Sequence, residues 1–230
     1  MKQFWHDLLF AHWPLPPATL RPLVPAQLEL ETFGGECWIG VVPFRMSGIR
    51  GRGLFPFPGL SRFPELNVRT YVTHGQKRGV YFFSLDAANR PAVYSARAFY
   101  HLPYFHAAMS SNEHHGTIRY SSLRYGTAAE FRGAYRPTSD PTPSSNGSLE
   151  HFLTERYCLY VTHRGHTYRG EIHHQPWPLQ AAEAELAVNT VAAASGLALP
   201  ETAPSLWFAR RLEVLIWPLR RTDSVSSRRV

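Results

Sequence analysis

Residues 64–73 read Pro-Glu-Leu-Asn-Val-Arg-Thr-Tyr-Val-Thr, and their polarity alternates along the chain. Because successive side chains of a β-strand point to opposite faces, such a strand has two different faces. One face carries Glu65, Asn67, Arg69 and Tyr71, and the other carries Leu66, Val68, Thr70 and Val72. Two interpretations remain open. The polar face lies in water on a half-exposed sheet, or it lines the inside of a barrel, where Glu65 and Arg69 need partners because unpaired buried charge is costly.

Further strands are predicted on both sides of this segment. They cover residues 27–32, 36–44, 79–86, 92–100, 117–125, 128–135, 155–162, 168–174 and 208–217. The turn Phe33-Gly34-Gly35 predicts a hairpin between the first two of these strands. Strands at this spacing predict an α+β, β-rich fold in which a largely antiparallel sheet forms a closed or half-closed barrel.

A few helices are expected around this sheet. Pro103 predicts a short helix over 103–109, and the Ala-rich segment 180–194, followed by Gly196, predicts a longer one. Brief helical turns are predicted after Pro16 and over 149–154, the latter capped by Ser148. Residues 47–63 are predicted to loop over the surface or a pocket mouth, and 137–148 to form a polar excursion. We therefore expect one domain over 1–219 and a basic, flexible tail over 220–230.

Composition narrows the function. The 230 residues carry a formal net charge of +7, but their arginines are scattered singly rather than grouped on one face, so nucleic-acid binding is not expected. No apolar run is long enough to span a membrane, and the N-terminal segment lacks the apolar core of a signal peptide. Cys37 and Cys158 form no redox or metal motif. The expected location is the cytoplasm.

A second group of polar residues lies near Pro103. Arg97 falls on one face of the predicted strand 92–100 and is a candidate partner for Glu65 or a clamp for an anion. His101 and Tyr104 flank Pro103 at the start of the predicted helix, where backbone N–H groups favour anions. The adjacent histidine pairs 114–115 and 173–174 point to opposite faces of their strands, so neither is a two-ligand metal site. No metal and no cofactor are predicted.

The order of these segments resembles a known family. The segments are WHDLLFAHW (5–13), LRPLVP (20–25), WIGVVPFRM (38–46), FPELNVRTYV (63–72), VYFFSLD (80–86), LPY (102–104), ERY (155–157), PWPL (176–179) and LEVLIWPL (212–219). They resemble the YqjF-like family of uncharacterised conserved proteins, within the acetoacetate decarboxylase-like superfamily. The resemblance implies a cone-like, largely antiparallel barrel with helices around a small pocket, and a homo-oligomer.

The resemblance also implies a change in chemistry. Acetoacetate decarboxylase forms a Schiff base through a lysine that follows a proline. Tyr104 stands at that place and Phe105 at the place of a neighbouring lysine, while Glu65 and Arg97 match an acidic pocket residue and an arginine. The resemblance places a second acidic residue of the decarboxylase pocket near Ile39, within an apolar strand, so that acid is lost here. Tyrosine cannot form an imine, so Schiff-base decarboxylation is not expected.

Three functional hypotheses follow. The first is a protein that binds a small anionic carboxylate metabolite in the barrel pocket, with ligand-binding residues Asn67, Arg69, Arg97 and His101. The alternative is an enzyme of lyase or hydrolase type, without a Schiff base. In it Glu65 acts as acid or base, Arg97 and Arg69 hold the carboxylate, and Tyr104 donates a hydrogen bond to a carbonyl. In the third hypothesis, Glu65, Arg69 and Arg97 form a structural ion network that binds no ligand.

Overall fold

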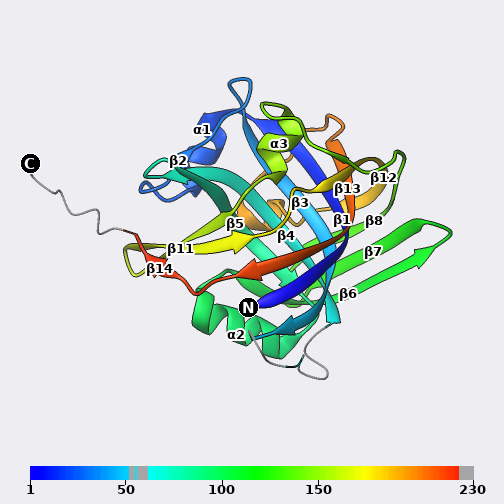
Figure 1. The fold of residues 1–230 in the computed structure, drawn as a ribbon, viewed down its shortest axis with the longest axis horizontal. Coiled ribbons are helices and arrows are strands. Elements are labelled where there is room, and N and C mark those ends of the chain that lie inside the picture. The colour runs from blue at the N-terminus through cyan, green and yellow to red at the C-terminus, as the bar shows by residue number, and fades with distance from the viewer. Residues whose placement is uncertain (52–54, 56–61, 223–230) are drawn as a thin grey trace, which may run out of the picture.

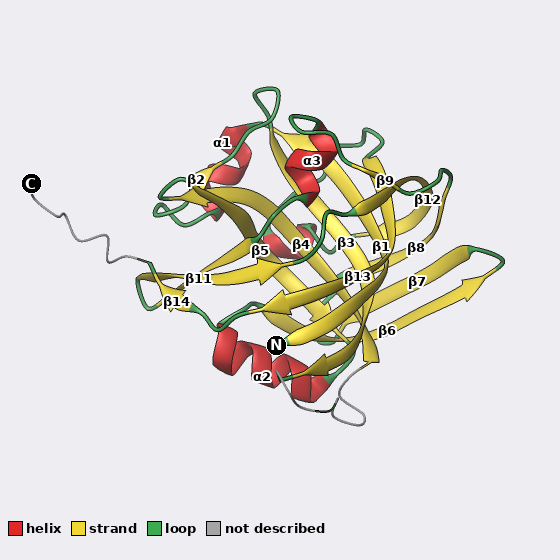
Figure 2. Cartoon of the chain, viewed as in Figure 1, coloured by secondary structure: helices red, strands yellow, loops and turns green. Residues whose placement is uncertain are grey.

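Strands make up most of the computed structural model, which describes residues 1–51, 55 and 62–222 (Figures 1 and 2). The long strands are β1 (Lys2–Leu15), β3 (Cys37–Arg50), β4 (Arg62–His74), β5 (Lys77–Ala87), β6 (Tyr104–His114), β7 (Thr117–Arg124), β8 (Glu130–Pro137), β10 (Cys158–His163), β11 (His166–His173), β12 (Pro178–Asn189) and β13 (Ser205–Ile216). The short ones are β2 (Glu29–Leu30), β9 (Thr142–Pro143) and β14 (Arg220–Arg221). The helices are α1 (Pro17–Leu20), α2 (Arg90–Tyr100) and α3 (Leu149–Thr154), with 3₁₀ turns η1 (Arg21–Leu23) and η2 (Ala193–Ser195).

Seven strands form a ring, in the order β1, β3, β4, β5, β10, β11 and β13. The contacts along β1, β3, β4 and β5 are long and antiparallel. The two contacts that complete the ring are short. Strand β10 meets β5 in parallel at two residue pairs, and β11 meets β13 at two. The barrel is therefore half-closed. We call this set of strands the seven-strand ring. In Figure 1, α2 lies at one end of it, and α1 and α3 lie toward the other end.

One glycine permits the short contact between β5 and β10. A Cβ atom on Gly79 would lie 2.7 Å from Sγ and 2.8 Å from the carbonyl oxygen of Cys158. Any larger residue at this position would push the two strands apart, because real Cβ atoms do not approach other atoms so closely. Closure of the ring depends on this position.

A second layer of strands covers one side of the ring. Strands β6, β7, β8 and β12 form a second connection between β5 and β13. A second ring therefore exists, and it shares five strands with the first: β5, β4, β3, β1 and β13. One apolar core fills the seven-strand ring, and another lies between its shared wall and the second layer. Strand β4 is consequently buried on both faces. Leu66 and Val68 enter the second core, and the opposite face of β4 points into the seven-strand ring. The half-exposed interpretation of residues 64–73 is therefore wrong.

Three predicted elements have the opposite secondary structure. Residues 92–100 belong to helix α2, because the Asn89 side chain caps its start by accepting from the Ala92 N–H. Residues 104–109 lie in strand β6; the Pro103 carbonyl just before it accepts a hydrogen bond from the Leu85 N–H, and parallel pairing to β5 follows. Residues 180–194 lie mainly in β12, where pairing with β8 overrides the helix preference of alanine and glutamate. Gly196 ends only the short turn η2.

Other boundaries differ less. The predicted hairpin around Gly34 is reduced to a single bridge, because β2 pairs with β4 instead of β3. The helical turns after Pro16 and over α3 are confirmed, and Ser148 caps α3 by accepting from the His151 N–H. The predicted loop 47–63 begins later, since β3 continues to Arg50, and residues 52–54 and 56–61 lie outside the described residues. Of the predicted tail, 220–221 form β14, and 223–230 lie outside the described residues.

Candidate functional site

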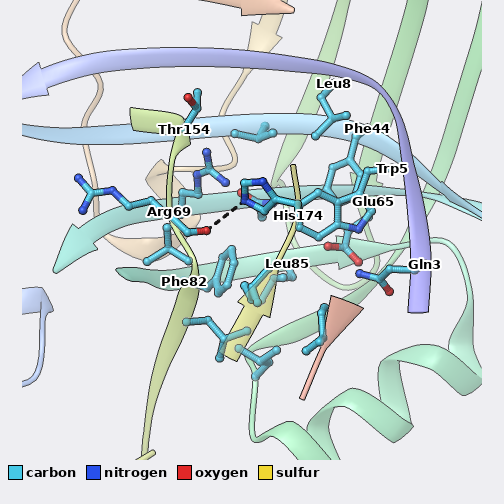
Figure 3. Close-up of a pocket in the computed structure, with 18 of the residues that line it drawn as sticks. Gln3, Trp5, Leu8, Phe44, Glu65, Arg69, Phe82, Leu85, Thr154 and His174 are labelled. Atoms are coloured by element: carbon cyan, nitrogen blue, oxygen red, sulfur yellow. Dashed lines mark hydrogen bonds between the residues drawn. The ribbon is translucent and has the colours of Figure 1, made fainter. Parts of the chain in front are cut away.

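A cavity of about 70 Å³ lies inside the seven-strand ring (Figure 3). The strand register arranges its polar wall in layers. Glu65 pairs with Phe44 and Ala87, Asn67 with Val42 and Leu85, and Arg69 with Gly40 and Phe82. Glu65, Asn67 and Arg69 thus follow one another along one wall, from the end near β6 toward the end near α3. Figure 3 shows Glu65 and Gln3 on one side of the cavity and Arg69 on the other.

The walls between these polar groups are largely apolar. The lining residues outside β4 include Trp5, Leu8, Val42, Phe44, Val80, Phe82, Leu85, Leu102, Leu159, Ile172, Trp177 and Ile216. The volume is several times the roughly 10–15 Å³ that one water needs. The space is therefore large enough for several waters or for a small organic molecule.

Glu65 and Tyr104 form the polar end near β6. The Tyr104 hydroxyl donates to Oε2 of Glu65 at 2.8 Å. The Tyr120 hydroxyl, from β7, donates to the Glu65 backbone oxygen at 2.7 Å and fixes this part of β4. Burial raises the pKa of Glu65 to about 8, although the Tyr104 hydrogen bond lowers it, and nearby Asp86 adds to the rise. Glu65 is therefore mostly protonated at neutral pH and presents a carboxylic acid to the cavity.

Arg69 is a buried cation without a carboxylate partner among the described residues. The residue is 8% exposed, and its Nη2 donates to the Leu153 carbonyl at 3.3 Å. Its Nε–H has no hydrogen-bond partner. The guanidinium lies against the rings of Phe10 and Tyr71, with Cζ 5.5 and 5.8 Å from their centroids. Ring contacts and one carbonyl do not neutralise a charge, so this site favours an anion.

A second arginine lines the same end. Arg156 pairs with Glu31 through Nη1 and donates from Nε to the Phe152 carbonyl at 2.7 Å, but its Nη2 has no partner. His174 lies nearby, and burial lowers its pKa, so its ring is mostly neutral near pH 7. Glu31 also pairs with the exposed Arg78, so this one carboxylate is shared by two arginines and leaves Arg69 without a carboxylate partner among the described residues.

Gly40 makes room for Arg69 and His12. These three residues lie side by side across β1, β3 and β4. A Cβ on Gly40 would lie 2.6 Å from Nε2 of His12. The His12 ring uses this space to bond the Tyr71 hydroxyl at 2.6 Å, and burial together with Arg69 lowers the pKa of His12 well below its usual value. His12 therefore adds no charge to the arginine end.

Four of the six predicted site residues line the cavity: Glu65, Asn67, Arg69 and Tyr104. Arg97 does not line it, because residues 92–100 form a helix and not a strand. Its Nε donates to the Tyr104 carbonyl at 2.6 Å, and its side chain lines a separate surface hollow. His101 ends α2 in the left-handed conformation and stacks on His163, with ring centroids 3.9 Å apart. The predicted clamp at Arg97 is thus corrected to a residue that holds the backbone of Tyr104.

Arg156 and His174 are the main cavity residues that sequence reasoning missed. Arg156 follows α3 and His174 follows β11, and both line the cavity together with residues of β4. The motif ERY was visible at 155–157, but nothing in its spacing related Arg156 to Arg69. Within the described ranges, no group of three or more histidine, cysteine or acidic side chains is arranged to hold a metal ion. None of the described helices is long and apolar enough to cross a membrane.

Comparison with known sequences identifies a family. The family model described as "Uncharacterized conserved protein" matches residues 2–213. The "Uncharacterized protein YqjF" of Bacillus subtilis (strain 168) is 52% identical over 222 residues, which cover 96% of this chain and 92% of the relative.

Comparison with solved structures identifies the fold. The enduracididine biosynthesis enzyme MppR in complex with pyruvate matches with a TM-score of 0.67 and 11% identity, over 96% of this chain and 89% of that one. Acetoacetate decarboxylase from Legionella pneumophila matches with a TM-score of 0.65 and 12% identity, over 96% and 86% of the two chains. At these identities the likeness concerns the fold alone, and it confirms the predicted acetoacetate decarboxylase-like architecture.

Proposed function

Because the chain belongs to this family of uncharacterized conserved proteins and has an acetoacetate decarboxylase-like fold, we propose that it binds a small carboxylate inside the seven-strand ring. The proposal rests on Arg69. It is a buried guanidinium that lines a cavity, has no carboxylate partner among the described residues and has an unused Nε–H. A ligand carboxylate would supply both the missing negative charge and the missing acceptor. Pyruvate, which is bound by MppR, belongs to this class of ligand.

The proposed activity does not use a lysine Schiff base. The sequence contains two lysines, Lys2 and Lys77, and neither lines the cavity. Their ammonium groups pair at the surface with Glu213 and Glu171, at 2.7 and 2.5 Å. Tyr104 projects into the cavity at the position that the family resemblance gives to the reactive lysine, and its hydroxyl bonds Glu65. Without a reachable amine, no imine with a carbonyl substrate can form.

A thermal-shift and calorimetric screen against short carboxylates tests this proposal. The matched pair of variants is Arg69→Met and Arg132→Met, because Arg132 is an exposed arginine on β8 far from the cavity lining. We expect saturating ligand to raise the melting temperature of the wild type and of Arg132→Met, but not of Arg69→Met. No shift with any carboxylate, or an equal shift in folded Arg69→Met, would overturn the proposal.

Catalysis is a second candidate function, and the ionisation of Glu65 supports it. A carboxyl group with a pKa of about 8 is a general acid or base matched to neutral pH. It faces the same cavity as Arg69, so a bound carboxylate could place its reacting carbon next to Glu65. The variant Glu65→Gln separates the two functions. If the protein is an enzyme, this variant binds the ligand but loses turnover. If ligand is bound and no wild-type turnover is detected, the protein is a binding module.

A further inference from the structure

A second hollow lies on the outside of the barrel, between helix α2 and the start of β6. Its volume is about 400 Å³, and its lining includes the aromatic residues Tyr94, Phe105 and Tyr125 and the nitrogen-bearing residues Arg90, Arg97 and His106. We call it the α2 hollow. None of the described residues lines both this hollow and the cavity inside the seven-strand ring. We propose that the α2 hollow binds a small organic phosphate, independently of the carboxylate site at Arg69.

Both arginines of the α2 hollow are held in place through their Nε atoms. Nε of Arg90 donates to Nδ1 of His106 at 3.3 Å, and Nε of Arg97 donates to the Tyr104 carbonyl at 2.6 Å. Among the described residues, the Nη groups of both arginines have no hydrogen-bond partner. Because Nδ1 of His106 accepts, the ring proton lies on Nε2, which is a further donor. The hollow therefore presents two oriented guanidinium groups whose forks are free to bind an anion.

The charge of the α2 hollow favours a dianion. No carboxylate is among its described lining residues, and neither Arg90 nor Arg97 forms an ion pair with a described residue. A third arginine, Arg124, lies against the Phe105 ring with Cζ 4.0 Å from the centroid, but Asp86 neutralises it at 2.8 Å. Two positive charges thus remain. A phosphate monoester carries a charge of about −1.5 to −2 at pH 7 and offers three terminal oxygens to the guanidinium forks, whereas a carboxylate carries one charge.

The aromatic walls of the α2 hollow favour an organic phosphate over inorganic phosphate. Tyr94 on α2 is 69% exposed, and Tyr125, which follows β7, is 58% exposed. The His106 ring stacks on Tyr125 with the ring centroids 4.6 Å apart, so imidazole and phenol form one continuous wall. Exposed rings beside cations can cover the apolar body of a ligand whose anionic group binds the arginines. A hollow of about 400 Å³ also has more space than a phosphate group alone fills.

Isothermal titration calorimetry of the full chain at low ionic strength tests this proposal with three probes. Phenyl phosphate has both the dianion and an organic body, phenyl sulfate has the same shape with a single charge, and inorganic phosphate lacks the organic body. We expect phenyl phosphate to bind about five- to tenfold more tightly than each of the other two, because only it uses both the charges and the rings. Equal binding of phenyl sulfate, equal binding of inorganic phosphate, or no binding of phenyl phosphate would overturn the proposal.

Four variants locate the phosphate. Arg90→Met and Arg97→Met should each weaken phenyl phosphate by about tenfold, since each removes a charged hydrogen-bond donor. Arg132→Met, on an exposed arginine outside the hollow, and Arg69→Met, inside the ring, should each change its affinity by less than about twofold.

The set remains decisive if one variant is unstable. Arg97→Met also loses the hydrogen bond to the Tyr104 carbonyl, so Arg90→Met decides the question if Arg97→Met does not fold. Binding that is lost in Arg69→Met and kept in Arg90→Met would place the phosphate inside the ring and overturn the proposal. The carboxylate screen depends on Arg69 and this experiment on Arg90, so either proposal can fail without the other.

Discussion

Replacing Glu65 by glutamine should change how the stability of the free protein depends on pH. In the folded state, burial raises the pKa of Glu65 from 4.5 to about 8, and in the unfolded chain the pKa returns to about 4.5. The folded protein therefore holds the proton more tightly. This stabilisation is complete below pH 4.5, decreases as the unfolded carboxyl ionises, and is lost as the pH rises through 8.

The expected size follows from this shift of about 3.5 pKa units. At about 1.4 kcal/mol per unit, the wild type should lose on the order of 5 kcal/mol of unfolding free energy between pH 4.5 and 8 through Glu65 alone. Glutamine has nearly the same shape as the protonated acid and does not titrate. The stability of Glu65→Gln relative to the wild type should therefore increase by up to about 1.4 kcal/mol per pH unit in this range.

Urea unfolding of both proteins at half-unit steps from pH 4.5 to 9 measures the difference. The groups around Glu65 are Tyr104 on β6, Tyr120 on β7 and Asp86 on β5, which pairs with Arg124. They are present in both proteins, so the comparison reports mainly Glu65. The control is Glu183→Gln, on an exposed glutamate of β12. For the control, the difference in unfolding free energy from the wild type should not vary with pH. The same constant difference for Glu65→Gln would refute a protonated Glu65.

Three further predictions concern the same wall. Arg69→Met should leave the free protein at least as stable in urea unfolding, because it removes a buried charge, and should weaken carboxylate binding by about 10- to 100-fold in calorimetry. Tyr104→Phe should raise the pKa of folded Glu65, because the lost hydrogen bond favoured its ionised form. In urea unfolding, the loss of stability caused by Glu65 should then extend to higher pH than in the wild type; an end at lower pH would contradict this role. Gly40→Ala should cost about 1–3 kcal/mol in unfolding experiments, because its Cβ would lie 2.6 Å from Nε2 of His12.

The alternation of polarity predicted correctly which residues share each face of β4. It did not predict whether the polar face would be buried or lie in water. Alternation separates Glu65 and Arg69 from Leu66 and Val68 by backbone geometry alone. It does not show whether a polar face meets water, because this depends on strands that arrive from elsewhere in the chain. The layer of β6, β7, β8 and β12 covers one face of the wall, and β10 and β11 close over the other.

On either side of Pro103, the predicted strand is a helix in the structure and the predicted helix is a strand. Local sequence signals explain both errors. Asn89 and Pro91 are ordinary helix-starting residues, but the preceding turn and the spacing of strands favoured another strand there. Proline at 103 suggested a helix start, yet a proline is equally suited to the residue before a strand. Arg97 was therefore assigned to the wrong kind of element and the wrong place. Tyr104 was expected in the pocket, and it lines the cavity from β6.

The arginine end of the cavity could not be assembled from sequence patterns. Arg156 lies 87 positions after Arg69, and Glu31, the carboxylate that pairs with Arg156, lies 38 positions before Arg69. These separations are set by loops, whose lengths leave no periodic signal. The family resemblance predicted the barrel, and the alternation along β4 predicted the residues of one cavity wall. The residues of the opposite wall could be identified only from the structure.

The energetic cost of the cavity itself supports a function. Glu65 is destabilising at neutral pH, because folding must keep its carboxyl protonated or desolvate its charge. Arg69 is destabilising because its buried charge has no described carboxylate partner. Apolar residues of similar volume would avoid both costs without altering the strand register. Destabilising polar groups that face one cavity are expected where a ligand compensates for them, so binding of the proposed carboxylate should recover the stability that the unpaired charge of Arg69 costs.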